Sequence, residues 1–362
     1  MANDRTKTFE DAIKAVNDAM LKKNKDEDIA VGLLSDMEAD VERFSTGSLV
    51  LDSVIGGGFP KGRVIEISGP ESSGKTSIAL TAIANVQKEG GNCVFIDVEQ
   101  AIDPMYAQVL GVDINKVAFA QPTFAEEALQ EIIYFAKTGA VDLIVLDSVA
   151  ALMTTAEYED ELEKAQVAPL PRLLAKSLKK IVPLCNKSGC SVIFINQIRD
   201  NIGVMWGPKT TTPGGRALKF AASQRIEVKR SSQIKEGDEI IGNEVKFKCV
   251  KNKVSRPFGT GTTVLTYNKG INNAAEIAVV GQDLGVIEKK GQTFFLKDYE
   301  GENIDTEKYE LTDNGIKLAV YQKNLIETLE EDEELRKEIG DIVKEKLLET
   351  EIGFIEGEDE NE

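Results

Sequence analysis

Runs of consecutive apolar residues mark the middle of the chain. Four short stretches are mainly apolar, at residues 64–68, 92–98, 141–148 and 191–196. Apolar and polar positions do not alternate along them, which indicates strands that are buried on both faces. Between the strands, apolar residues recur at helical spacing, as at residues 125–137. We therefore predict an α/β fold in which a mostly parallel central sheet lies between helices.

The first part of the chain predicts an amphipathic helix. Within residues 8–23, apolar side chains recur at i, i+4, i+7 and i+11, opposite a charged face. These apolar positions are Phe9, Ile13, Val16 and Met20. The stripe has to be buried, and the sequence leaves open whether it packs on its own body or on a neighbouring subunit. We assign residues 1–43 to an N-terminal helix and linker with a role in subunit docking.

The last part of the chain predicts a small α+β domain over residues 273–350, after a core of residues 44–272. Helical patterns enclose one strand-like stretch. The helical patterns fall at residues 274–284, 318–332 and 335–349, and the strand-like stretch at residues 291–299. Half of the final residues, 351–362, are acidic and none is basic, so we expect them to form a disordered acidic tail.

A glycine-rich turn follows the first apolar stretch. Residues 69–76 read GPESSGKT and fit G-x-x-x-x-G-K-[ST], the phosphate-binding loop, between a strand and a helix. Backbone N–H groups and the helix N-terminus would surround phosphate oxygens, Lys75 would reach the β- and γ-phosphates, and Thr76 would hold Mg²⁺. The alternative is an ordinary Gly/Ser turn. The predicted nucleotide contacts here are Gly69, Pro70, Glu71, Ser72, Ser73, Gly74, Lys75, Thr76 and Ser77.

Charge is distributed unevenly along the chain. The 43 basic and 61 acidic residues give a net charge of −18, which by itself argues against a nucleic-acid partner. However, residues 327–362 contain 16 acidic and 4 basic residues, so the remaining body is nearly balanced. The net charge therefore does not exclude binding of nucleic acid by the body of the protein.

The composition excludes several kinds of site. The chain has no histidine, and its four cysteines form no C-x-x-C pair, which argues against a zinc site or a His-based catalytic triad. The cysteines are expected to be reduced and buried. No apolar run reaches the length of a membrane span, and no signal-peptide pattern opens the chain. We expect a cytoplasmic protein without a membrane partner.

Polar side chains follow three of the apolar stretches. Glu99, Asp147 and Gln197 each stand at or just after the end of a predicted strand. Ligands bind at the carboxyl ends of the strands in open α/β sheets, so these side chains are expected to converge on one bound nucleotide. Asp147 is the expected partner of Thr76 in holding Mg²⁺.

A long loop follows Gln197. Residues 199–216 read RDNIGVMWGPKTTTPGGR and contain the only tryptophan of the chain among several cations. Cations that track phosphates and apolar groups that pack on bases are typical of single-stranded DNA binding. The alternative is a flexible surface loop with an incidental aromatic residue.

Several segments together resemble the bacterial and phage RecA recombinase family. They read RFSTGSLVLD, GPESSGKT, FIDVEQAIDPMYAQVLGVDI, GAVDLIVLDSVAAL, IFINQIRDNIGVMWG and KCVKNKVSRPFGT, in that order. The resemblance covers residues 44–267 and continues more weakly towards the C-terminus. It identifies residues 44–272 as a RecA-like ATPase and DNA-binding core.

The resemblance implies roles at the ATP site. Glu99 would activate the attacking water, and Gln197 would sense the γ-phosphate and signal to the following loop. Asp103 and Tyr106 would contact adenine, Tyr106 by stacking. Lys251 and Lys253 would reach across a subunit interface to a neighbour's γ-phosphate, although ordinary solvated lysines are the alternative. The family has a histidine where this chain has Gln100.

The resemblance also implies two DNA sites. The primary site would use two loops, of which the first, residues 157–171, departs from the family because it is acidic and contains two prolines. This loop has the alternative of a solvated connector before a basic helix. The implied primary contacts are Arg172, Lys179, Arg199, Ile202, Met205, Trp206, Gly214, Gly215 and Arg216. The implied contacts to duplex DNA are Lys229, Arg230, Lys246 and Lys248.

The resemblance implies an ATP- and Mg²⁺-dependent recombinase. Such a protein forms a helical filament on single-stranded DNA and exchanges strands with homologous duplex in DNA repair and the SOS response. The family also implies single-strand-binding and mediator proteins as partners, and a repressor for co-protease activity. The alternatives are a hexameric helicase or RadA-like ATPase, and a regulatory ATPase that does not exchange strands.

Overall fold

The computed structural model describes residues 2–23, 31–33, 41–159, 169–200, 210–297, 304 and 308–356. The chain divides into two compact units, Met1–Glu42 and Arg43–Glu362. In the first unit, helix α1 (Ala2–Lys23) begins six residues earlier than the sequence pattern predicted. The Asn17 side chain ties α1 to Val31, accepting from its N–H at 2.7 Å and donating to its carbonyl at 3.0 Å. Phe9, Val16 and Met20 are exposed on this unit.

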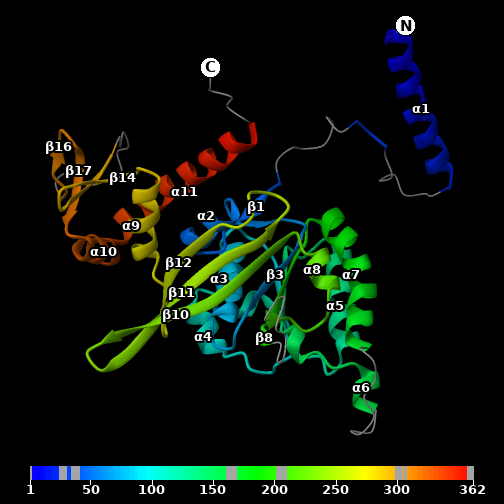
Figure 1. Cartoon of the computed structure of the whole chain (residues 1–362), viewed down its shortest axis with the longest axis horizontal. Helices are drawn as coiled ribbons and strands as arrows, with labels where there is room; N and C mark the ends of the chain where they lie inside the picture. Colours follow the sequence, from blue (N-terminus) through cyan, green and yellow to red (C-terminus); the bar gives the residue numbers. More distant parts are fainter. Residues whose placement is uncertain are drawn as a thin grey trace. The chain divides into compact units, whose positions relative to one another are not determined.

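The second unit is built around a nine-stranded sheet within the described residues (Figure 1). Its strand order is β13-β12-β11-β10-β3-β7-β6-β4-β5. The pairs from β10 to β5 are parallel and those from β10 to β13 are antiparallel, which confirms the predicted mostly parallel sheet. The bounds are β3 Val64–Gly69, β4 Cys93–Asp97, β5 Val117–Ala120, β6 Leu143–Asp147, β7 Ser191–Gln197, β10 Gln224–Glu236, β11 Glu239–Asn252, β12 Thr260–Thr266 and β13 Gly270–Ile271.

Helices cover both faces of this sheet, as the apolar runs predicted. Ile65 and Ile67 belong to the core that contains helix α3, whereas Val64 belongs to the core that contains α5 and α7. Successive residues of one strand therefore fill two separate cores, which is why the strand sequences do not alternate. The helices of this region are α2 Leu49–Ile55, α3 Lys75–Lys88, α4 Pro104–Val109, α5 Ala125–Thr138, α6 Thr155–Glu159, α7 Pro169–Ser188 and α8 Ala217–Ala221.

Short elements complete the region. Two small antiparallel ribbons pair β1 with β2 and β8 with β9. Single turns of 3₁₀ helix precede β5 and follow β6. The bounds are β1 Arg43–Phe44, β2 Phe59–Pro60, β8 Arg199–Asp200, β9 Thr210–Thr211, η2 Ile114–Lys116 and η3 Val149–Ala151.

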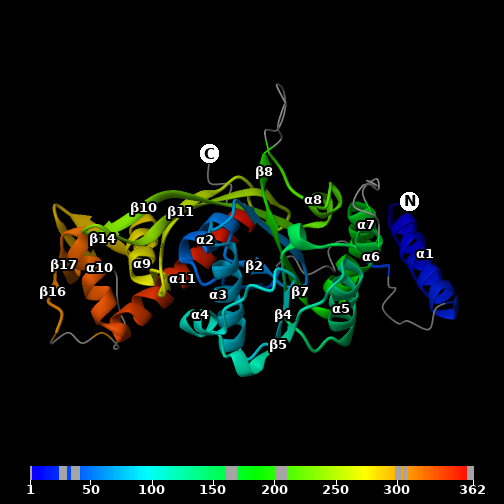
Figure 2. The same cartoon turned by 90° about the horizontal axis from the view of Figure 1, so that it is seen from below.

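The C-terminal part contains a second, antiparallel sheet that lies beside α9 and α10 (Figure 2). The strand order is β14-β15-β17-β16. Its core is continuous with that of α3, because Ile277 and Leu325 belong to the same apolar cluster as Ile78. The bounds are α9 Asn273–Asp283, β14 Ile287–Lys290, β15 Thr293–Leu296, β16 Leu311–Thr312, β17 Gly315–Val320, α10 Gln322–Glu331 and α11 Glu333–Glu356.

Two sequence expectations need correction here. The helix predicted over residues 318–332 is wrong at its start, because residues 318–320 belong to strand β17. Ile316 and Leu318 are buried two residues apart, which is strand spacing, and Tyr321 has a φ of +71° that separates the strand from α10. Helix α11 also continues to Glu356, into the segment expected to be disordered. Among the described residues, no helix is long and apolar enough to cross a membrane.

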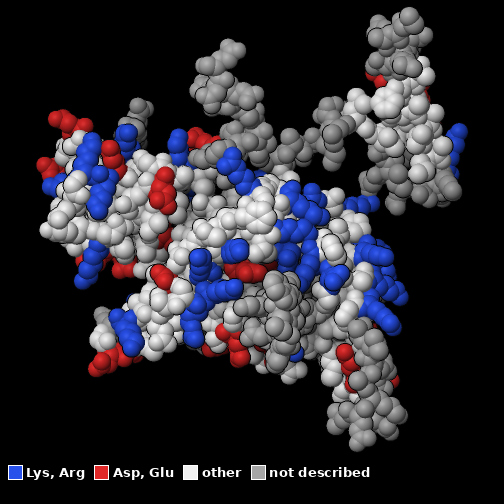
Figure 3. Space-filling view, viewed as in Figure 1, with Lys and Arg blue, Asp and Glu red and all other residues white. Residues whose placement is uncertain are grey.

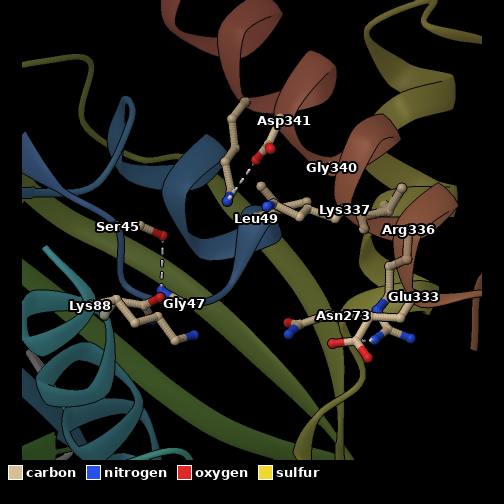
Figure 4. Close-up of a pocket in the computed structure, with 13 residues that line it drawn as sticks. Ser45, Gly47, Leu49, Lys88, Asn273, Glu333, Arg336, Lys337, Gly340 and Asp341 are labelled. Atoms are coloured by element: carbon tan, nitrogen blue, oxygen red, sulfur yellow. Dashed lines mark hydrogen bonds and ion pairs between the residues drawn. The ribbon is translucent and has the colours of Figure 1, made fainter. Parts of the chain in front are cut away.

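A cavity of about 230 Å³ lies where α2, α3, α9 and α11 meet (Figure 4). Lys88 at the end of α3 and Lys337 on α11 are among its lining residues, together with the Arg336–Glu333 and Lys344–Asp341 ion pairs. None of the residues predicted to bind nucleotide or DNA lines this cavity. We therefore treat it as separate from the candidate site.

Candidate functional site

The predicted phosphate loop connects β3 to α3 and requires its glycines. A Cβ on Gly69 would lie 2.1 Å from the carbonyl oxygen of Val228, so only glycine fits. Gly74, the N-cap of α3, has a φ of +91° and provides no side-chain cap. The first N–H groups of α3 are therefore left to bind an anion. The buried Ser73 hydroxyl has no hydrogen-bond partner among the described residues, and a phosphate oxygen would satisfy it.

Lys75 and Thr76 begin helix α3. The Lys75 ammonium donates to the carbonyl of Pro70 at 2.6 Å, across the loop that it is expected to complete around phosphates. Burial lowers the pKa of Lys75, and the carboxylates of Asp147, Glu99 and Glu71 oppose that effect. An added phosphate would supply the negative charge that this partly desolvated cation lacks.

The predicted metal pair is in direct contact. Thr76 Oγ1 donates to Asp147 Oδ2 at 2.6 Å, although the two residues are 71 positions apart. Burial raises the pKa of Asp147 to about 6, and Glu99 adds to the shift. No cluster of three or more acidic or cysteine side chains suited to a metal occurs in the described ranges. A hydroxyl, a carboxylate, phosphate oxygens and water are the ligand set that Mg²⁺ uses beside a phosphate loop.

Glu99 lies beside this pair and is oriented by two donors. Gln197 Nε2 donates to Glu99 Oε1 at 3.1 Å, and the Ser148 hydroxyl donates to the same oxygen. The backbone N–H of Glu99 bonds to the carbonyl of Asp147 at 3.3 Å, which holds the ends of β4 and β6 together. Glu99, Asp147 and Gln197 thus lie together as expected, and their joint contact with a nucleotide stays a prediction. The sequence analysis missed Ser148, although its place after Asp147 at a strand end was a usable signal.

The two residues expected to contact adenine lie at helix α4. Tyr106 hydroxyl shares a hydrogen bond of 2.8 Å with Ser77 Oγ, one residue beyond Thr76. Asp103 is the N-cap of α4 and accepts from the N–H of Met105 at 2.8 Å. The structure therefore brings Tyr106 to the phosphate-loop helix and gives Asp103 a capping role.

Lys251, expected at a γ-phosphate, does not lie near the phosphate loop of its own chain. It pairs with Arg225 of β10, which pairs with Glu66 in the middle of β3 and not with the phosphate loop at the end of that strand. Its ammonium donates to the carbonyls of Lys219 and Phe220 in α8, at 2.8 and 3.0 Å. Burial, with a contribution from neighbouring Lys253, lowers its pKa to about 8.

The residues expected at the primary DNA site are described only in part. Ile202, Met205 and Trp206 lie outside the described residues. Arg199 is on β8, and Arg216 is the N-cap of α8. Gly214 and Gly215 have φ values of +84° and +74°. A Cβ on Gly214 would lie 2.7 Å from Leu174 of α7, so Gly214 also has a packing role.

Basic side chains gather on α7, α8 and the β10–β11 hairpin (Figure 3). Arg172 and Lys179 are exposed on α7, and much of the loop before it, residues 160–168, lies outside the described ranges. Lys229 lies directly opposite Lys246 in the strand ladder, and its ammonium forms an ion pair with the carboxylate of Glu227 at 3.6 Å.

The face of each hairpin cation follows from strand pairing. Lys248 pairs with Glu227, on the same face as Lys229 and Lys246. Arg230 instead pairs with Val245, which is buried, and so it belongs to the other face of the ladder. Three of the four cations assigned to duplex DNA therefore share one face.

A mostly parallel sheet in which a G-x-x-x-x-G-K-[ST] loop joins a strand to a helix, with polar and acidic side chains at the neighbouring strand ends, defines the P-loop class of nucleotide-binding proteins. Comparison with known proteins places the chain more narrowly. A family model described as the RecA N-terminal domain matches residues 7–272.

Curated proteins give the same family over most of the chain. Protein RecA of Mesomycoplasma hyopneumoniae (strain 7448) is 48% identical over 311 residues, which cover 86% of this chain and 87% of the relative. Protein RecA of Staphylococcus epidermidis (strain ATCC 12228 / FDA PCI 1200) is 41% identical over 365 residues, covering 100% and 97%. Protein RecA of Acinetobacter baylyi is 45% identical over 309 residues, covering 85% and 84%. The chain belongs to the RecA family of recombinases, and the helicase or RadA-like alternative is not favoured.

Proposed function

We propose that this recombinase binds ATP with Mg²⁺ in the site around the phosphate loop and uses its hydrolysis to control a filament on single-stranded DNA. The contact that carries the proposal is the one between Thr76 and Asp147, at 2.6 Å, beside the Gln197–Glu99 contact at 3.1 Å. A loop for phosphate, a pair for metal and an oriented carboxylate are the parts that phosphoryl transfer to water requires.

Different residues around the loop would bind the phosphates, the metal ion and the base of ATP. Backbone N–H groups of residues 71–77 and the Ser73 hydroxyl would hold phosphate oxygens, and Lys75 would leave Pro70 for the β- and γ-phosphates. Thr76 and Asp147 would hold Mg²⁺, which supplies charge stabilisation to the transferring phosphoryl group. Tyr106 would stack on the base, with Asp103 beside it.

Glu99 is the proposed general base. Both of its donors, Gln197 and Ser148, bond to Oε1. This leaves Oε2 as the oxygen that takes a proton from the attacking water. Gln197 bonds to Glu99 in this structure, and contact with a γ-phosphate would draw its amide away. The side chain would then report nucleotide to the loop that follows it.

A neighbouring subunit would complete the site. Lys251 lies at the level of Glu66, and Lys253 bonds through its N–H to Ser223, which bonds to Val64 at the start of β3. Both lysines therefore lie away from the phosphate loop of their own chain, and we assign them to the γ-phosphate of an adjacent subunit. The apolar stripe of α1, exposed on its own unit, would dock on such a neighbour. Both contacts lead to a head-to-tail polymer, which is the geometry of a filament.

The proposed DNA contacts lie on the loop 199–216, α7 and the hairpin. Arg172, Lys179, Arg199 and Arg216 would track the phosphates of a single strand, with Ile202, Met205 and Trp206 against its bases. Gly214 and Gly215 would let the backbone approach the strand. Lys229, Lys246 and Lys248, with Arg230 at the rim, would hold the duplex partner.

The experiment that tests the site is ATP turnover of Lys75→Ala with and without single-stranded DNA. Loss of turnover is expected, since the cation that faces the phosphates is gone. Lys88→Ala is the matched control, because Lys88 is exposed at the other end of the same helix. Turnover of Lys75→Ala at the wild-type rate would exclude this assignment. A strand-exchange assay with ATP then tests recombination itself.

A further inference from the structure

A buried polar network lies between the nucleotide site and the end of the loop 199–216. Its centre is Glu66, which is 0% exposed in the middle of the apolar strand β3. Glu66 Oε2 accepts from Arg225 Nε at 2.5 Å, and Oε1 accepts from Asn196 Nδ2 at 3.0 Å. A carboxylate is costly to bury, so its position inside a strand indicates that both partners are needed there.

Asn196 connects three parts of the chain. Its Oδ1 accepts from the N–H of Gln197 at 3.0 Å, and its Nδ2 also donates to the carbonyl of Pro213 at 3.2 Å. Gln197 in turn contacts Glu99. The side-chain amide of Asn196 is 0% exposed and has both donor hydrogens occupied. Any displacement of the Gln197 backbone therefore acts on a group that is also bonded to Pro213, at the end of the proposed DNA loop.

Glu66 keeps this amide in one orientation. Without the carboxylate, the amide could rotate, and the bond to Pro213 would no longer depend on the position of Gln197. Arg225 fixes Glu66 from the β10 side, and Arg225 lies opposite Lys251 in the ladder. Two residues of one chain therefore lie near the same buried carboxylate: Gln197, proposed to sense the γ-phosphate of its own subunit, and Lys251, proposed to contact that of a neighbour.

We propose that Asn196, oriented by Glu66, is a positioning residue that transmits the state of Gln197 to Pro213 and so makes DNA affinity depend on nucleotide. This inference rests on the proposed function and adds the residues that couple its two sites. The coupling factor is the ratio of the affinity for DNA with ATP bound to the affinity without it. By thermodynamic linkage, DNA raises the affinity for ATP by the same factor.

The variant Asn196→Asp tests the network. It keeps the acceptor for the Gln197 N–H but replaces the donors to Glu66 and Pro213 with a carboxylate oxygen. We measure affinity for a fluorescent single strand with and without a non-hydrolysable ATP analogue, and affinity for the analogue with and without DNA. The expected result is a loss of about tenfold in the coupling factor in both directions, with affinity for the analogue alone unchanged.

One control variant and a second network variant separate loss of coupling from loss of folding. Asn243→Asp makes the same change at a buried asparagine of the same sheet, which bonds to Tyr267 and lies outside the network, and it should leave the coupling factor unchanged. Glu66→Gln removes the charge opposite Arg225 but keeps an acceptor for Asn196, so an intermediate loss is expected.

Amide hydrogen exchange of the wild-type chain tests the same network without any variant, so its result does not depend on whether a variant folds. The analogue alone, without DNA, should change the exchange of peptides that span residues 210–216. Unchanged exchange at residues 210–216, or a wild-type coupling factor in both Asn196→Asp and Glu66→Gln, would refute the role of this network in coupling. Either result would leave the proposed function intact. If the DNA affinity of the wild-type chain is the same with and without ATP, both the coupling network and the proposed function are refuted.

Discussion

Glu276 offers a direct test of how the C-terminal part is attached to the core. This residue of α9 is 2% exposed, and its carboxyl accepts from the Ser48 hydroxyl at 2.6 Å and from the N–H of Leu49 at 2.7 Å. The Thr263 hydroxyl also donates to it. Glu276 therefore caps helix α2 from a distant part of the chain, with buried Asp52 nearby.

Burial makes this contact depend on pH. It raises the pKa of Glu276 from 4.5 to about 7, with Asp52 adding to the shift and the three donors opposing it. Between these values the folded chain keeps a proton that the unfolded chain has lost, so the free energy of unfolding falls as pH rises. The full difference corresponds to about 3 kcal/mol, and the part between pH 5.5 and 8 to about 2 kcal/mol.

The variant Glu276→Gln removes this titration and keeps the shape. The amide oxygen would accept from Leu49, and the NH₂ group would donate to the hydroxyl oxygens of Ser48 and Thr263. We expect the variant to gain stability relative to wild type as pH rises, by about 2 kcal/mol between pH 5.5 and 8. The lower limit of that range stays above the isoelectric point of about 4.7.

The assay is urea unfolding followed by circular dichroism at the two pH values, with the exposed Glu334→Gln as control for loss of one charge in the same region. The result is the difference in free energy of unfolding between Glu276→Gln and wild type at each pH, because all other titrating groups are common to the two proteins and cancel. A difference that does not change with pH would refute the assignment of the raised pKa to Glu276.

Three further outcomes follow from the structure. Burial raises the pKa values of Cys93 and Cys185 to about 12, so a thiol reagent at neutral pH should modify the native chain only at the rate of unfolding; rapid modification would contradict their burial. Gly69→Ala should lower the melting temperature and weaken nucleotide binding, since its Cβ would clash with Val228; wild-type values for both would show that the loop adjusts. Lys246→Ala should reduce the salt dependence of duplex DNA binding by about one in log–log slope, and an unchanged slope would remove Lys246 from that site.

Much of the central fold was predictable because burial on two faces leaves a strong pattern. The strands that end near Asp147 and Gln197 were recognised from apolar runs alone, and their parallel arrangement follows from those runs. The small C-terminal sheet was recognised only in part. Its strands are two to six residues long, and residues 318–320 read as the first turn of the helix that follows.

The candidate site was predictable where residues lie at strand ends and less so where they lie inside strands. Thr76, Glu99 and Asp147 could be assigned from motif and position. Glu66 is a charged residue within an apolar run, which was a visible anomaly, but its partners Asn196 and Arg225 depend on strand order. That order places β10 and β7 on either side of β3, and no local pattern reports it.

The contact of Lys251 with α8 has a consequence for filament ends. The last carbonyls of α8 hold the ammonium in the single chain, so a neighbour's phosphate would have to replace them. In the proposed head-to-tail polymer, every interior subunit makes that exchange. One end subunit keeps Lys251 on its own helix, while the subunit at the other end has a phosphate loop that no neighbour completes. The two ends are thus chemically distinct, which would give the filament a preferred direction of growth and release.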